Sequence, residues 1–543
     1  MNLAKRDWLP MKWPCGPLEI ARRNKSGSID AGVKETLEAW VRPSALDLLK
    51  DTPINCLVVD WADGGPEDSA QQQALKPLLE AGRKWGISFV GKLALKEGVS
   101  AAVSAARAAG LSTVMLDAAS GQSLDLPAIR QFPRDKAAWE AASTPFSVAE
   151  NVWPGLNLQT MNGDTALAGP TGIPWVNSNA WFSLLASELA PGKTLWLDLD
   201  PPAASNLLHP ADYALAVADS CAYGSQWIIS LDDKLRAALP KGNSQAQGVW
   251  KSLCEAVAFF ENHKGWQAFR SQGILAVISD FRGDNAYMSG EVLNLLNRRQ
   301  VQFRIIDRVT MGLRPTQGNE NQRRHPREGG DPSFAPNTMD SRFRGNDESI
   351  GRAKSPPLLE GLKAVLWLDP EKPSSEQRAQ LLAFVQHGGL VITAAYWGTS
   401  DVTPTKKDPS LRYRLYNIGQ GQIAVADEIF QDPYQVAVDA HLLVSRRNDL
   451  VRLYNPGTTN CRLSDGFVSP YRGKRLVQVL NYSSEPASYV TLWVNGKVES
   501  ARLWQLGAAE ARTLQGRSAS RGTEFDLPPV SVYCALEFEG TNL

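Results

Sequence analysis

The feature that most constrains the fold is the alternation of short apolar runs with helical segments over residues 15–270. Stretches rich in Ala and Leu with helical period, such as 74–85 and 98–110, lie between several of the runs. Apolar strands separated by helices are typical of parallel strands buried on both faces of a sheet. We predict strands at 18–21, 56–61, 88–93, 113–117, 145–150, 174–179, 194–200 and 227–232.

This count of strands, spread over about 250 residues, fits a (β/α)8 barrel of the TIM type. We therefore expect an α/β fold whose barrel covers residues 1–270 and forms the catalytic domain. A doubly wound open sheet is the alternative. It would be favoured by a Gly-x-Gly-x-x-Gly turn after a strand, and the sequence contains no such turn.

The remainder of the chain suggests two further domains. Strands at 274–280, 302–307, 364–369 and 390–394, with helices at 289–299 and 375–387, predict a flavodoxin-like α/β domain over 271–405. Its segment 318–354 is charged, rich in Gly, Asn and Pro, and lacks apolar periodicity, so we expect a disordered surface loop. Residues 406–543 contain short apolar runs between turns, which predict β-sandwich structure. Those runs are 420–426, 436–444, 450–454, 475–481, 488–494 and 530–538.

Composition excludes several classes of protein. Lys and Arg together number 57, as do Asp and Glu, and this balance argues against a nucleic-acid partner. No apolar run is long enough to span a bilayer, so we expect no membrane insertion. The six cysteines form no Cys-x-x-Cys pair and the five histidines are scattered, so we predict neither a metal nor a cofactor. The amino terminus lacks the apolar region of a signal peptide, which favours a cytoplasmic protein; a true start upstream would allow a periplasmic or secreted one.

Acidic residues recur where the predicted barrel strands end, the place where barrels hold their reactive groups. Two carboxyl groups suffice to cleave a glycosidic bond, one as acid and one as nucleophile or base. We expect Glu150 as acid/base, since Pro154-Gly155 breaks the chain after it, and Asp232 as nucleophile or base. Asp117 and Asp200 are substitutes. The structural alternative is that such an Asp only caps the following helix.

Tryptophan supports a carbohydrate ligand, because the flat faces of sugar rings stack on indoles. Thirteen of the 17 tryptophans precede residue 270, and several adjoin predicted strand ends. The candidate substrate-binding residues are Asp60, Trp61, Trp153, Trp175, Asn177, Asn179, Trp181, Trp196 and Trp227.

The domain order, together with 364–369 followed by Phe-Val-Gln-His-Gly-Gly-Leu-Val-Ile-Thr at 384–393, resembles the multidomain bacterial β-galactosidases. The resemblance implies a glycoside hydrolase whose middle domain is amidotransferase-like, without that chemistry, and packs subunits into a homo-oligomer. No cysteine lies between Cys254 and Cys461, as an active amidotransferase would need. The family carries its acid in an Asn-Glu pair at the fourth strand and a second Glu at the seventh. Here Glu150-Asn151 and Asp232 stand in their places.

Residues 324–347 resemble the translation of a palindromic repeat element of bacterial genomes. Its two arms correspond to His-Pro-Arg-Glu-Gly-Gly-Asp-Pro and Asp-Ser-Arg-Phe-Arg-Gly-Asn-Asp. The resemblance implies a bacterial host and a segment inserted after the fold was established, so its basic residues should not form a binding patch.

The sequence therefore predicts a hydrolase of O-glycosidic bonds in an oligo- or polysaccharide, of retaining or inverting type. A carbohydrate-binding or scaffold protein on a degenerate barrel is the main alternative. A metal-dependent hydrolase is a weaker one, because histidine is scarce at the strand ends.

Overall fold

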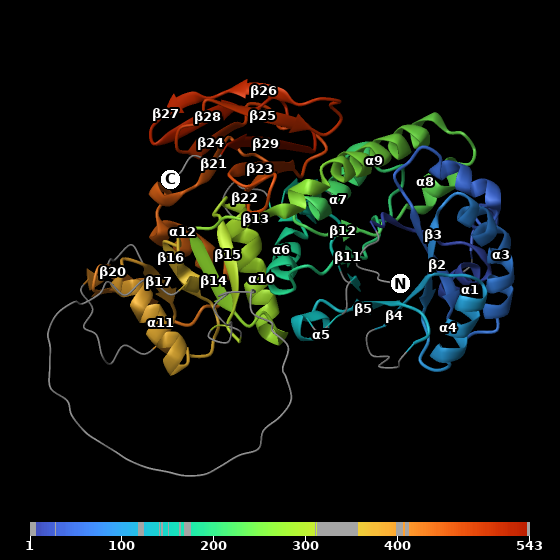
Figure 1. Cartoon of the computed structure of the whole chain (residues 1–543), viewed down its shortest axis with the longest axis horizontal. Coiled ribbons are helices and arrows are strands. Elements are labelled where there is room, and N and C mark those ends of the chain that lie inside the picture. The colour runs from blue at the N-terminus through green and yellow to red at the C-terminus, as the bar shows by residue number, and fades with distance from the viewer. Residues whose placement is uncertain are drawn as a thin grey trace, which may run out of the picture.

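The computed structural model describes residues 7–27, 29–117, 124–140, 142, 145–149, 151–161, 164–167, 175–309, 311, 357–397, 406–407 and 412–539. Figure 1 shows a barrel in blue and green, a second α/β region in yellow, and antiparallel sheets in orange and red. Among the described helices, none has the length and apolar character needed to cross a membrane. The predicted disordered insertion and the palindromic-repeat segment lie outside the described residues.

The first part of the chain forms a sheet of eight parallel strands that closes almost completely into a barrel. Closure comes from the residues after the last strand, where Met11 and Ile229 form a parallel bridge and Ile229 N donates to Pro10 O at 2.9 Å. The predicted barrel is therefore confirmed over an open sheet. In order round the ring the strands are β1 (Pro10–Lys12), β2 (Cys56–Ala62), β3 (Ser88–Leu93), β4 (Thr113–Asp117), β5 (Ala128–Phe132), β6 (Phe146–Val148), β11 (Leu195–Leu197) and β12 (Gln226–Trp227).

Two predicted strands were wrong and two were missed. Residues 18–21 lie in helix α1 (Gly16–Ser26), which has Pro17 in its first turn, where proline's missing N–H costs nothing. Residues 174–179 contain only β10 (Val176–Asn177), which pairs antiparallel with β7 (Gly155–Leu156) outside the barrel. The missed strands, β1 and β5, are short and carry polar residues on their inward face.

Helices cover the outside of the barrel and bury the outward-facing strand residues. Helix α3 starts earlier than predicted, whereas α4 fits the predicted segment 98–110. The remaining helices connect later strands or lie beside them. The helices are α1, α2 (Ala31–Ala39), α3 (Asp68–Lys84), α4 (Val99–Ala108), α5 (Lys136–Glu140), α6 (Ala180–Leu189), α7 (Pro210–Cys221), α8 (Asp233–Ala238) and α9 (Ser244–Asn262).

The second part is a seven-stranded sheet in the order β15-β14-β16-β17-β20-β19-β18. Its first five members are parallel and, numbered along the chain, follow the order 2-1-3-4-5 of one class of doubly wound sheet. The strands are β14 (Leu275–Ser279), β15 (Phe303–Asp307), β16 (Ala364–Trp367), β17 (Leu390–Thr393), β18 (Lys406–Lys407), β19 (Tyr413–Ile418) and β20 (Gly421–Ala426).

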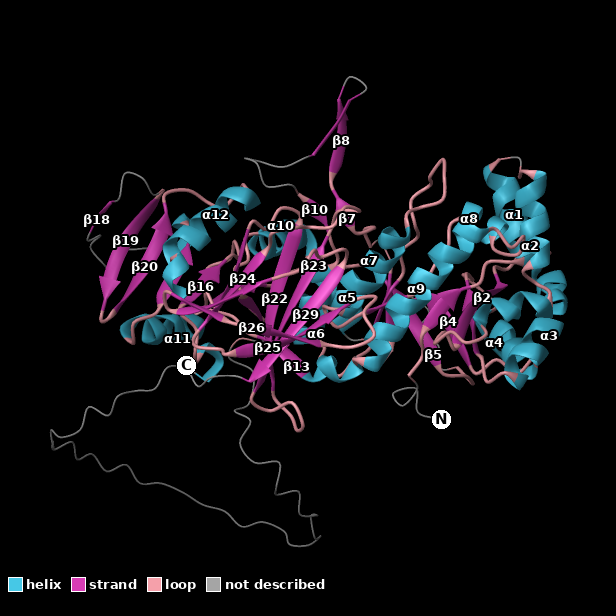
Figure 2. Cartoon of the chain, turned by 90° about the horizontal axis from the view of Figure 1, so that it is seen from above, coloured by secondary structure: helices cyan, strands magenta, loops and turns pink. Residues whose placement is uncertain are grey.

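Helices cover both faces of this sheet, as buried parallel strands require. Helix α11 (Ser375–Gln386) packs on one face, and α10 (Gly283–Arg298) and α12 (Pro433–Val444) on the other (Figure 2). Residues 436–444 were wrongly predicted as a strand, because Asp432 caps α12 and Pro433 opens its first turn. The predicted domain boundary at 405/406 falls inside the sheet, since β19 and β20 come after it.

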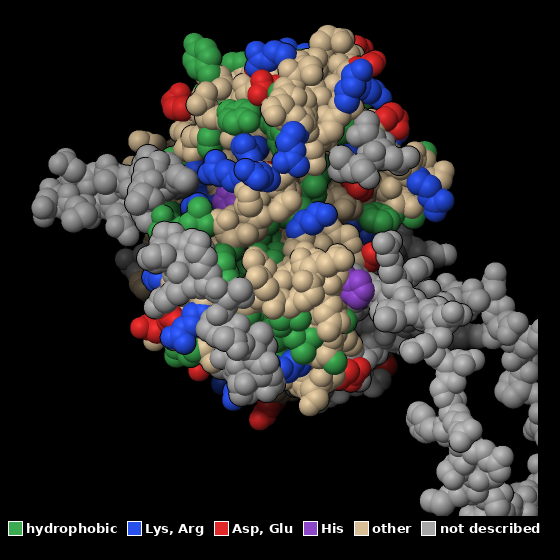
Figure 3. All heavy atoms as spheres, turned by 90° about the vertical axis from the view of Figure 1, so that its left-hand side faces the viewer, with side chains coloured by type: hydrophobic (Ala, Val, Ile, Leu, Met, Phe, Trp, Pro, Cys, Tyr) green, Lys and Arg blue, Asp and Glu red, His purple; other side chains and the backbone are tan. Residues whose placement is uncertain are grey.

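The third part consists of two antiparallel sheets that share one apolar core, which includes Val477, Leu492 and Phe525. Figure 3 views the molecule from the left-hand side of Figure 1, and basic, acidic and apolar side chains are mixed on that face. One sheet contains β13 (Phe269–Ser271), β22 (Thr459–Gly466), β23 (Lys474–Asn481), β29 (Tyr533–Glu539), β25 (Ser500–Gln505) and β26 (Arg512–Gln515). The other contains β21 (Val451–Tyr454), β24 (Thr491–Asn495), β28 (Gly522–Asp526) and β27 (Arg517–Ala519).

Candidate active site

The interior of the barrel can be followed two residues at a time, because alternate side chains of a strand point to opposite faces. One apolar cluster fills it, formed by Trp8, Cys56, Val58, Val90, Met115, Ile129, Trp196 and Ile228. Two residues further on, the same face of the strands carries polar side chains, namely Asp60, Lys92, Asp117, Gln131, Asp198 and Ser230. The carboxyl end of the barrel is therefore a layer of charged and hydrogen-bonding groups above a closed apolar plug.

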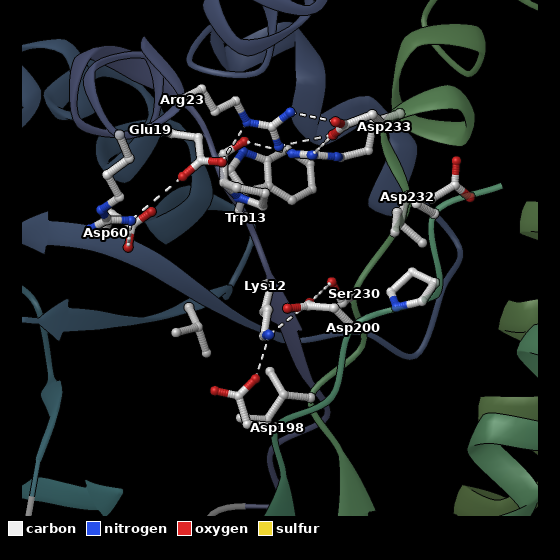
Figure 4. Close-up of a pocket in the computed structure, with 18 of the residues that line it drawn as sticks. Lys12, Trp13, Glu19, Arg23, Asp60, Asp198, Asp200, Ser230, Asp232 and Asp233 are labelled. Carbon is white, nitrogen blue, oxygen red and sulfur yellow. Dashed lines mark hydrogen bonds and ion pairs between the residues drawn. The ribbon is translucent and has the colours of Figure 1, made fainter. Parts of the chain in front are cut away.

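A pocket of about 500 Å³ opens at this end of the barrel. Its lining combines acidic residues from β2 and from the segment after β11 with Lys12 and Lys92, which lie on β1 and β3. Helix α1 contributes Glu19 and two arginines to its rim. Figure 4 shows the two charged groups of the pocket, one around Lys12 and one around Arg23.

Lys12 lies at the centre of the first group. Its ammonium pairs with Asp198 and, at 2.7 Å, with Asp200 Oδ1, which also accepts a hydrogen bond from Ser230 Oγ at 2.5 Å. Burial lowers the pKa of Lys12, but the two carboxylates outweigh it and the net shift is upward. Burial likewise tends to raise the pKa of Asp200, but Lys12 and Ser230 lower it overall. The lysine therefore stays protonated between two negative side chains.

Asp198 is the most enclosed carboxylate of this group, with 9% of its side chain exposed. Gln131 Nε2 donates to its Oδ2 at 2.6 Å, and Lys92 Nζ lies 3.8 Å from the same oxygen. Three strands other than its own thus fix the position of one carboxylate at the pocket wall.

Asp60 also faces the pocket, from the end of β2. Its Oδ1 pairs with Arg22 Nη1 at 2.8 Å, and 10% of its side chain is exposed. This arginine comes from α1, the segment that the sequence had suggested as a strand.

Asp232 lines the pocket but acts as a helix cap. Its Oδ1 accepts the backbone N–H groups of Lys234 and Leu235 at the start of α8, and its Oδ2 accepts the Tyr213 hydroxyl at 2.6 Å. Figure 4 shows its carboxylate turned away from Lys12. Because this carboxylate caps α8 and points away from Lys12, the geometry favours the structural alternative over the predicted nucleophile.

The other predicted acids and amides are dispersed. Asp117 ends β4 on the interior face but is not among the described residues that line the pocket. Glu150 lies outside the described residues. Asn179 is fully buried and bonds to Val152 and Asp219, while Asn177 belongs to β10, outside the barrel sheet. These amides do not meet the acidic residues of the pocket.

The predicted indoles do not wall this pocket either; among its described lining residues, Trp13 alone supplies an indole. Trp61 and Trp227 are buried because they occupy outward-facing positions beneath helices, whereas Trp196 points inward but lies in the apolar plug. Three others are half-buried outside the pocket: Trp153 packs edge-on against Tyr213 and Trp227, Trp181 lies under the Arg134 guanidinium, and Trp175 packs on the main core.

Several pocket residues were missed by sequence reasoning, above all Lys12, Arg22 and Ser230. Ser230 follows the interior residue Ile228 by two positions within the predicted strand 227–232, so strand periodicity could have found it. Lys12 follows the interior residue Trp8 by four positions and could have been found once β1 was recognised. Arg22 carried no such signal. In the described chain, no three His, Cys, Asp or Glu side chains are grouped so as to hold a metal ion.

No family model matches the chain, and no curated protein matches it. Solved structures with similarity include a β-galactosidase from Bacillus circulans sp. alkalophilus, at 10% identity over 98% of this chain and 89% of that one, with a TM-score of 0.41. An apo exo-carrageenase GH42 from Bacteroides ovatus follows, at 10% identity over 67% and 45%, with a TM-score of 0.35. A β-galactosidase from Rahnella sp. R3 has 10% identity over 86% and 66%, with a TM-score of 0.34. At such values, function must be argued from the site.

Proposed function

We propose that the chain binds a carbohydrate at the mouth of the barrel and hydrolyses an O-glycosidic bond there. The observation that carries the proposal is the convergence of carboxylates from β2 and β11 in one pocket at the carboxyl ends of the strands. A charged carboxylate beside the anomeric carbon stabilises the positive transition state or attacks it. Asp198, which Lys12 and Gln131 hold against the pocket, takes this role.

The proton donor in this proposal is Asp117: it is not among the described lining residues, but it follows Met115, which lines the pocket, by two positions on the same face of β4. Glu150 is the alternative donor, since it follows β6 in the sequence. We also propose that the middle sheet belongs to a flavodoxin-like fold, because its strand order is that of flavodoxin-like sheets. Subunit packing through that sheet is part of the proposal as well.

A carbohydrate-binding protein without catalysis is the second candidate, and one observation favours it. A proton donor needs a raised pKa, as burial or a neighbouring carboxylate provides. The pKa values of Asp200 and Asp233 in this pocket are instead lowered, because Lys12 and the arginines Arg23 and Arg236 outweigh the effect of burial.

The test is a panel of p-nitrophenyl glycosides and oligosaccharides, assayed with the wild type and with Asp198→Asn, Asp117→Asn and Glu150→Gln. We expect turnover by the wild type and a loss of about 1000-fold or more in Asp198→Asn. Loss of the proton donor should slow oligosaccharides far more than p-nitrophenyl substrates, whose leaving group needs little protonation.

Asp47→Asn is the matched control, because Asp47 only pairs with Lys50 on the surface and should leave turnover unchanged. Saturable glycan binding without any product would support the non-catalytic candidate. Full turnover by Asp198→Asn would remove that residue from the mechanism.

A further inference from the structure

A second cavity, of about 660 Å³, lies at the opposite end of the barrel from the candidate active site. Its walls come from the amino-terminal ends of β1, β11 and β12, from helix α9, and from strands β22 and β23 of the C-terminal sheet. Cavities of this size at the junction of structural units are common places for small ligands. It is independent of the mouth pocket, and no described residue lines both.

The polar centre of this cavity is Arg462. Its Nε donates to Ser271 Oγ at 3.0 Å and its Nη1 to Ala222 O at 2.7 Å, which fixes the guanidinium on two separate segments. Among the described residues, no carboxylate pairs with it. Glu188 lines the same cavity and forms no ion pair with another described residue, although its charge acts on Arg462. Nη2 therefore has donors to offer to a ligand.

A guanidinium held in place with unused donors is suited to an anionic group, above all a planar carboxylate. The charges of the cavity lining as a whole also favour an anionic ligand. Its basic residues are Lys193, Lys264, Arg270 and Arg462, against the acids Asp7, Glu188 and Glu261, and Lys264 already pairs with Asp7 and Glu261.

Aromatic rings form the other wall. Trp266 is half-buried and packs on His263 at a tilt of 31°, with 4.3 Å between ring centroids, and His263 itself lies 4.5 Å from Phe259. Such a supported indole presents a rigid face for a flat or ring-shaped apolar surface. Gln478, which donates to the Tyr533 hydroxyl through its Nε2, leaves its carbonyl oxygen as an acceptor in the same cavity.

We propose that this cavity is a binding site for an acidic sugar, with the carboxylate on Arg462 and the ring against Trp266. The site is separate from the proposed hydrolysis, so the presence or absence of turnover at the barrel mouth leaves it untouched. A uronic acid combines the three chemistries that the cavity offers, namely a carboxylate, a ring face and hydroxyl groups for Gln478.

The experiment is calorimetric titration of the full chain with D-glucuronate, D-glucose and inorganic phosphate. We expect saturable binding of glucuronate and affinity at least about tenfold weaker for glucose, which lacks the carboxylate. Arg462→Lys should weaken glucuronate about tenfold, because lysine keeps the charge but loses the planar fork. Glu188→Gln should tighten it by a few-fold, since it removes the unpaired acid without touching a structural contact.

Asp47→Asn serves as the matched control and should leave the affinity unchanged, because Asp47 pairs with Lys50 on the surface and lines neither pocket. Equal binding of glucose and glucuronate, or of phosphate and glucuronate, would overturn the assignment. So would absence of binding, or an affinity that stays the same in both Arg462→Lys and Glu188→Gln.

Discussion

Replacement of Lys12 by Met tests whether the charge cluster at the barrel mouth stabilises the fold. The change removes the ammonium that pairs with Asp198 and Asp200 while keeping a long apolar side chain. Breaking a buried pair by removing one partner costs about 3–5 kcal/mol. In the variant, Asp198 still accepts a hydrogen bond from Gln131 and lies near Lys92. Asp200 is 67% exposed, so water screens its unpaired charge, and both effects reduce the cost. We therefore expect a loss of about 2–3 kcal/mol.

The assay is urea denaturation of the wild type, Lys12→Met, Asp198→Asn and the double variant. The double variant should be more stable than the sum of the single losses predicts, by about 1 kcal/mol or more, because the unpaired charge is gone. Lys34→Met is the control: its ammonium meets Glu38 at 4.0 Å on the surface, where a pair is worth less than about 0.5 kcal/mol.

High pH provides a second measurement on the same variants. The folded-state pKa of Lys12 lies above its ordinary value of 10.5, so its contribution is complete below that pH. It is lost as the pH rises through the folded pKa, and the wild type should converge on Lys12→Met there. A Lys12→Met variant no less stable than Lys34→Met, or single losses that add without coupling, would refute this account.

Two further predictions concern the half-buried Asp232 and the buried Asp219. Asp232→Ala should lower the free energy of unfolding by about 1–2 kcal/mol through loss of the α8 cap, whereas Asp232→Asn should keep turnover; abolished hydrolysis in a folded Asp232→Asn would contradict the structural role. Burial raises the pKa of Asp219, so unfolding free energy should fall as pH rises from the ordinary pKa through the folded one. Asp219→Asn should remove that slope, and titrated denaturation curves with identical slopes would disprove it.

The barrel could be predicted from sequence because its longer strands are continuous apolar runs between helical segments. β3 and β4 have the same first and last residues as the predicted segments 88–93 and 113–117. β1 and β5 could not be found in the same way, since three to five residues with Lys12 or Gln131 turned inward show little apolar pattern. The apolar residues at 18–21 misled for the opposite reason, as a short helical stripe and a short strand look alike.

The candidate site was only half accessible to sequence reasoning. The strand-end rule named Asp60, Asp200 and Asp232, which line the pocket, but it could not tell a cap such as Asp232 from a pocket wall such as Asp60, because that depends on which helix follows and how it packs. For some tryptophans, the sequence could have shown whether the side chain faces the barrel interior. Asp60 and Trp61 are neighbours in one strand, so only one of them can face the interior.

The position of Lys12 explains why stability and function have to be tested with different variants. Its strand pairs with β2 on one side and meets Ile229 on the other, at the seam where the barrel closes. The ammonium reaches past β12 to carboxylates that follow β11, so one ion pair both spans the seam and forms the pocket wall. Loss of activity in Lys12→Met would therefore not distinguish chemistry from an opened seam. Asp198→Asn keeps the size, and one oxygen can still accept from Lys12, so a loss of turnover in a variant whose unfolding curve shows an intact fold reports on the lost charge.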